Sequence, residues 1–148
     1  ANPGRITFQV SLAEVLLSQK RYADARALMQ EALARNPGNY PITSTLAAIE
    51  IADGNGAAAA DYLRELTRRL PSQEQLWLRL AEAEGMARNI VGVHRARAEY
   101  DVLMGDLRSA QRQLRQAQEK LPAGSAERQV VSERLGELPH RLQAREAG

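Results

Sequence analysis

Most catalytic and metal sites are built from histidine, cysteine and carboxylate side chains, and this sequence has few of them in a useful arrangement. It has no cysteine, and His94 and His140 lie 46 residues apart. Neither has a second histidine four residues away, the spacing that places two metal ligands on one helical face. We recognise no nucleophile with a neighbouring base and no phosphate-binding loop. We therefore predict no catalytic, metal-binding or cofactor-binding residue in this chain.

The arginines have a spacing suited to binding an acidic partner. Arg108, Arg112 and Arg115 follow steps of four and three residues, so they share one face of a helix. The same half of the chain adds Arg88, Arg95 and Arg97. This possible basic edge competes with a plainer interpretation, a solvated helical face, which we favour. The net charge is only +2, and nucleic-acid binding usually needs a concentrated basic patch, so we expect no nucleic-acid partner.

These residues must be positioned by helices, because the chain is rich in Ala and Leu and poor in aromatic residues. Pro3, Pro37 and Pro71 recur every 34 residues, and the first two lie in the same triplet, Asn-Pro-Gly. Proline ends helices, and 34 residues of helix and turn is the length of a tetratricopeptide repeat. The pattern predicts an all-α tetratricopeptide-repeat superhelix, an α-solenoid, of about three and a half repeats with a C-terminal capping helix.

The first repeat is expected at about 6–39, with helices over Ile6–Gln19 and Tyr22–Ala34. If Ile6 is position 1, seven residues are of the type that the family uses at their positions: Leu12, Ala13, Leu16, Ala25, Met29, Ala32 and Pro37. The second repeat, at about 40–73, matches less closely, because Glu50 stands where a large apolar residue is usual. The third begins at residue 74, with Trp77, Leu80 and Ala81 at positions 4, 7 and 8.

The period changes after Pro71, since the next proline of the series is Pro122, 51 residues further on. This interval is one repeat plus one helix and its turn. We predict helices at about 73–86, 89–104 and 106–120, with the middle helix shared between a repeat at 74–90 and one ending at 122. A capping helix is expected at 125–138, with its apolar face formed by Val130, Val131, Leu135 and Leu138. We interpret residues 1–148 as a single domain and as part of a longer chain.

Three side chains that invite a functional interpretation are expected to be structural. Trp77 and Tyr100 are predicted to pack between helices, and His94 to be a surface or half-buried histidine without a metal role.

The strongest candidate site is a protein-binding groove. In tetratricopeptide arrays the first helices of successive repeats line a concave surface through positions 2, 5, 9, 12 and 13. The lining residues on which we focus are Val10, Glu14, Leu17, Ile51, Leu78, Glu82 and Met86. We predict that this mixed apolar and acidic groove accepts an extended or helical polypeptide, or is filled by a neighbouring domain or by the chain's own C-terminal helix. The adaptable side chain of Met86 suits varied ligands.

Three motifs between Leu76 and Leu121 resemble the C-terminal domain of the β-barrel assembly-enhancing protease family. They are Trp77-Leu78-Arg79-Leu80-Ala81-Glu82-Ala83, Ala96-Arg97-Ala98-Glu99-Tyr100 and Gly105-Asp106-Leu107-Arg108-Ser109-Ala110. The family comprises periplasmic zinc metallopeptidases of Gram-negative bacteria. The resemblance implies a non-catalytic docking domain, with the zinc and the H-E-x-x-H helix in a separate catalytic domain of the parent protein.

The same resemblance implies the periplasm as the location, and protein partners: the β-barrel assembly machinery, its client outer-membrane proteins or the parent's own protease domain. The absence of cysteine fits an oxidising compartment, and we expect no membrane insertion, because no apolar run approaches a membrane span. The alternative is a free-standing repeat adaptor or co-chaperone that binds peptide segments in its groove.

Overall fold

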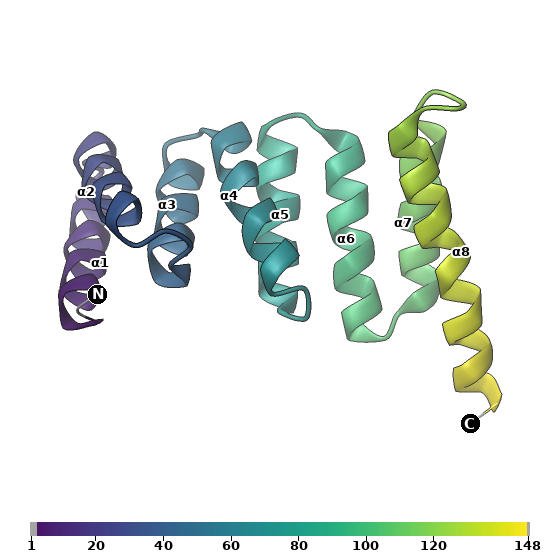
Figure 1. The fold of residues 1–148 in the computed structure, drawn as a ribbon. Coiled ribbons are helices and arrows are strands. Elements are labelled where there is room, and N and C mark those ends of the chain that lie inside the picture. The colour runs from purple at the N-terminus through teal and green to yellow at the C-terminus, as the bar shows by residue number, and fades with distance from the viewer. Residues whose placement is uncertain (1–2, 148) are drawn as a thin grey trace. The chain divides into compact units, whose positions relative to one another are not determined.

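The computed structural model describes the backbone of residues 3–147 and the side chains of residues 4–138. The chain divides into two compact units, Ala1–Pro71 and Ser72–Gly148. Every element in the described part of the chain is an α-helix, so the all-α prediction is confirmed (Figure 1).

The first unit contains α1 (Pro3–Ser18), α2 (Tyr22–Arg35), α3 (Tyr40–Ala52) and α4 (Gly56–Arg69). Each helix packs against the next, and α1 also contacts α3. One predicted boundary is wrong: α1 starts at Pro3, not at Ile6. Proline has a fixed φ and no N–H, and both features suit the first turn of a helix.

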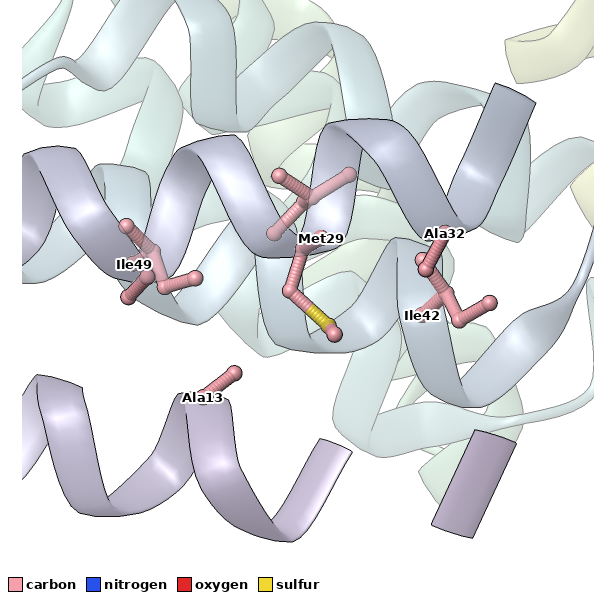
Figure 2. Packing of buried hydrophobic residues seen from close by; sticks show 7 residues of the cluster. Ala13, Met29, Ala32, Ile42 and Ile49 are labelled. Carbon is pink, nitrogen blue, oxygen red and sulfur yellow. The ribbon is translucent and has the colours of Figure 1, made fainter. Parts of the chain in front are cut away.

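The core of the first unit forms where α2 packs between α1 and α3. Met29, fully buried, lies with Ala25 and Ala32 on one stripe of α2. This stripe meets Ala13 of α1 and the buried face of α3, which consists of Ile42, Leu46 and Ile49 (Figure 2). The small alanines allow the helices to approach closely, so α2 holds α1 and α3 next to each other.

The second unit contains α5 (Glu74–Met86), α6 (Ile90–Met104), α7 (Leu107–Glu119) and α8 (Ala126–Ala147). The helix α6 packs against both α5 and α7, as a helix shared by two repeats should. The repeat boundaries and the single-domain interpretation themselves stay predictions.

Four turns share one geometry, in which a residue with positive φ ends the preceding helix. These residues are Lys20, Gly54, Arg88 and Gly105, with φ of 60°, 82°, 59° and 82°. In each turn the next N–H donates to a carbonyl five residues back: Arg21 to Leu16, Asn55 to Glu50, Asn89 to Glu84 and Asp106 to Asp101. The first three turns are 34 residues apart and the fourth follows after 17. The turn at residue 105 therefore repeats the turn geometry at half the usual interval.

The helix α8 differs from the predicted capping helix in two respects. It continues beyond residue 138 to Ala147, because the segment 141–147 consists of strong helix formers. Val131 and Leu138 are buried against α7, and Leu135 packs beside them, but Val130 is 48% exposed. The assignment of Val130 to the apolar face was therefore wrong, since it lies one position away from the buried stripe.

Candidate protein-binding surfaces

Four of the predicted groove residues belong to the first unit, on the neighbouring helices α1 and α3. Val10 and Leu17 of α1 are half-buried and pack partly against the core of the unit. Ile51 of α3 is half-buried, and Glu14 is exposed. None of the four is fully enclosed, so this part of the surface presents accessible apolar groups beside one carboxylate.

The other three predicted groove residues lie on α5 in the second unit. Leu78 and Met86 are each 38% exposed, and Glu82 is also exposed. These side chains again combine apolar and acidic chemistry. That the two sets form one continuous groove stays a prediction, and so does the binding of a polypeptide by either set.

An ion-pair cluster joins α2 to the end of α3, where Ile51 lies. The Nε of Arg26 donates to Oε1 of Glu50 at 2.5 Å, and its Nη2 donates to Oδ2 of Asp53 at 2.5 Å. The side-chain amide of Asn55 donates to both carboxylates at 3.3 Å. Since the Glu50 side chain is only 7% exposed, its partners replace the water that it loses on folding.

The bonds to Asp53 and then to Glu50 raise the pKa of Arg26 above its ordinary value. A group whose pKa is raised in the folded state contributes stability below its unfolded pKa and loses that contribution as the pH rises through the folded value. For arginine this window lies at strongly alkaline pH. The cation at residue 26 is therefore present throughout the physiological range.

A related carboxylate is buried at the same repeat position in α5. Glu84 is 1% exposed, and the side-chain amide of Asn89 donates to its Oε2. Through its Oδ1, Asn89 also accepts the backbone N–H of Gly92 at 3.1 Å, which caps α6. A Cβ at residue 92 would lie 1.8 Å from Oε2 of Glu84, so glycine makes room for the carboxylate.

Sequence reasoning missed the role of these two acids. Glu50 was noted only as an exception to the apolar pattern, and Glu84 was not singled out. The signal that was available is an Asn five residues after each Glu, repeated with the 34-residue period at residues 55 and 89.

The predicted basic edge lies on α7. Arg108, Arg112 and Arg115 are all exposed, opposite the buried face of the helix, and none of them forms an ion pair within residues 4–138. By contrast, the Nη1 of Arg95 lies 3.3 Å from Oε1 of Glu127 on α8, so part of its charge is already balanced. The geometry permits contact with an acidic partner, and such contact stays a prediction.

The residues expected to be structural are only half-buried. Trp77 on α5 and Tyr100 on α6 both have intermediate exposure, which corrects the expectation that they are buried. The Nδ1 of His94 lies 2.8 Å from Oε1 of Gln113, a hydrogen bond between α6 and α7. The side chain of His140 lies outside the described residues.

Two searches of the described residues complete the description of the surface. No helix there combines the length and the apolar character needed to cross a membrane. Within the same residues, no group of three or more histidine and acidic side chains could hold a metal ion.

The fold defines an α-helical repeat protein, in which successive helix pairs are joined by turns of one geometry. Residues 16–84 match the family model described as tetratricopeptide repeat, which supports a tetratricopeptide-repeat domain and the predicted fold class. The matched segment runs from α1 to α5 and includes α2, α3 and α4 completely. Comparison with curated proteins gave no match. Domains of this family are typically non-catalytic and mediate protein–protein interaction through extended surfaces.

Proposed function

We propose that this chain is a non-catalytic docking domain that binds a polypeptide segment of a partner protein along the first helices of its repeats. The observation that carries the proposal is the accessibility of apolar side chains on α1, α3 and α5. Leu17 and Ile51 are half-buried, and Leu78 is 38% exposed. Accessible apolar groups beside Glu14 and Glu82 suit a ligand with apolar and basic side chains.

A capture experiment tests this proposal. The triple variant Leu17→Asp, Ile51→Asp, Leu78→Asp should fail to retain proteins from an envelope extract and should keep its helicity in far-ultraviolet circular dichroism. The matched control is Ile90→Asp, Met104→Asp, Val130→Asp, since these residues are 49%, 58% and 48% exposed and lie outside the predicted groove. If both variants capture the same proteins as the unmodified chain, the groove is not the binding site.

We further propose that the parent protein is a periplasmic zinc metallopeptidase that acts in the assembly and quality control of outer-membrane β-barrel proteins. The support is the resemblance carried by the motifs at 77–83, 96–100 and 105–110. The partners would be the β-barrel assembly machinery, its clients or the protease domain of the parent. Zinc would belong to that catalytic domain.

The alternative is a free-standing repeat adaptor or co-chaperone, and the gene distinguishes the two. A coding sequence with a signal peptide and H-E-x-x-H upstream supports the metallopeptidase, whereas their absence supports the adaptor. A zinc titration of these 148 residues adds a second test. Stoichiometric zinc binding, or proteolysis by the isolated chain, would contradict a non-catalytic domain.

A further inference from the structure

The outer face of α1 carries an apolar stripe that no described residue covers. Phe8, Leu12 and Val15 are 68%, 40% and 51% exposed. Their spacing of four and three residues places them on one side of the helix. Val10 of the predicted groove lies two residues after Phe8, about 200° around the helix. The stripe is therefore a surface separate from the groove.

The same three repeat positions on α3 show what such a stripe does. Residues 42, 46 and 49 follow residues 8, 12 and 15 by 34, and Ile42, Leu46 and Ile49 are each 0% exposed. They are covered by α2, whose stripe of Ala25, Met29 and Ala32 packs against them. In Figure 2 the labelled residues of α2 and α3 meet in this interface.

From this equivalence we infer that α1 is a docking surface for one amphipathic helix of the α2 type, supplied from outside these 148 residues. The occupant presents small or flexible apolar residues at i, i+4 and i+7, as α2 does, and packs across Phe8, Leu12 and Val15. Burying three large side chains is worth roughly 1.5–3 kcal/mol each before the association costs, which is sufficient for a specific contact.

A second copy of the chain is poorly suited to this role. Its own stripe of the required type on α2 is buried against α3, and the equivalent stripe on α7, formed by Ala110, Leu114 and Ala117, is buried against α8. The occupant is therefore a partner helix that carries its own uncovered stripe.

A chimera tests this inference directly. A copy of residues 22–39, which comprise α2 and its turn, replaces residues 1–5, so that the added helix precedes Ile6 in the 34-residue register. Because the chain has no cysteine, Val15→Cys provides one reporter thiol. The rate at which a maleimide alkylates this thiol should fall at least about tenfold relative to the chain without the added helix. The melting temperature of the chimera should also rise.

The control chimera carries Ala25→Lys, Met29→Lys and Ala32→Lys in the added copy only, and its thiol should react at the rate of the unextended chain. Equal rates in both chimeras would overturn the inference. Sedimentation velocity of the unmodified chain adds a second arm. A dimer that Phe8→Asp converts to a monomer would make a second copy the occupant, which would also overturn it. Neither result depends on the groove of the proposed function.

Discussion

Glu50 and Glu84 occupy equivalent positions in two repeats, and each fills with a carboxylate a place that an apolar side chain usually takes. In the first repeat that place is held by Leu16. A buried carboxylate is tolerated only when it is hydrogen-bonded, and the two sites achieve this with different partners. Glu50 uses Arg26 from the preceding helix and Asn55, whereas Glu84 uses Asn89 and the space left by Gly92.

The Arg26 site predicts a specific pattern of stabilities. Arg26→Met should lower the free energy of unfolding by about 2–3 kcal/mol, because Glu50 keeps its burial and loses its cation. Adding Glu50→Leu should recover most of that loss, since an apolar pair of similar volume needs no desolvation. Arg21→Met is the control: its pair with Asp24 is more than half exposed and should change the stability by less than about 1 kcal/mol. Urea denaturation measures all three, and a double variant weaker than Arg26→Met would contradict the explanation.

Gly92 predicts a contrast between two helical glycines. Gly92→Ala should lower the free energy of unfolding by about 1–3 kcal/mol, because the added Cβ displaces the buried carboxylate of Glu84 from Asn89. Gly136→Ala meets no atom within 4 Å and should be neutral or stabilising by up to about 1 kcal/mol, as alanine favours helix. Thermal and urea unfolding of both variants provides the comparison. Equal stabilities would show that residue 92 has room for a side chain.

At the scale of elements, the turns show why the 34-residue period changes after Pro71. The turns at residues 88 and 105 have the same hydrogen bond and the same positive φ as those at residues 20 and 54. The helix between residues 88 and 105 is thus preceded and followed by turns of the kind that join two helices within a repeat. This geometry lets α6 pack against α5 on one side and α7 on the other.

Two of these turns predict opposite effects of exchanging glycine and arginine. Arg88→Gly should raise the free energy of unfolding by about 0.5–1 kcal/mol, because positive φ is unfavourable for an L side chain. Gly54→Arg should lower it by a similar amount, about 1 kcal/mol, since a Cβ there meets no atom within 4 Å and only the backbone is strained. Urea midpoints of the two variants that move in the same direction would contradict a conformational origin.

The sequence was sufficient for the fold class and for most helix boundaries. Helix propensity, the prolines and the apolar stripes are local signals, and α2 to α7 begin and end within one or two residues of the predicted places. The partners of Glu50 were not predictable from local pattern, because Arg26 is 24 residues away and belongs to another helix. The groove residues could be placed on their helices, but their ligand leaves no trace in spacing, so their function stays a prediction.

At the scale of the whole molecule, the account assigns two kinds of surface to one helical scaffold. Accessible apolar residues on α1, α3 and α5 are proposed to hold a polypeptide, and the outer stripe of α1 is proposed to hold a helix. The buried residues of each unit, together with the ion pairs that join neighbouring helices, keep these surfaces in place. Such an example is Arg134 of α8, which makes a two-bond contact with Glu99 of α6 at 2.7 and 2.9 Å.

Site-specific photo-crosslinking in the parent protein, inside the cell, tests the central claim of protein docking most directly. A benzoylphenylalanine replaces Leu17, Ile51 or Leu78 in turn, and replaces the exposed Val130 as the control position. The account predicts adducts with a partner protein from positions 17, 51 and 78 and none from position 130. Adducts from position 130 alone, or none from any of the three groove positions, would contradict it.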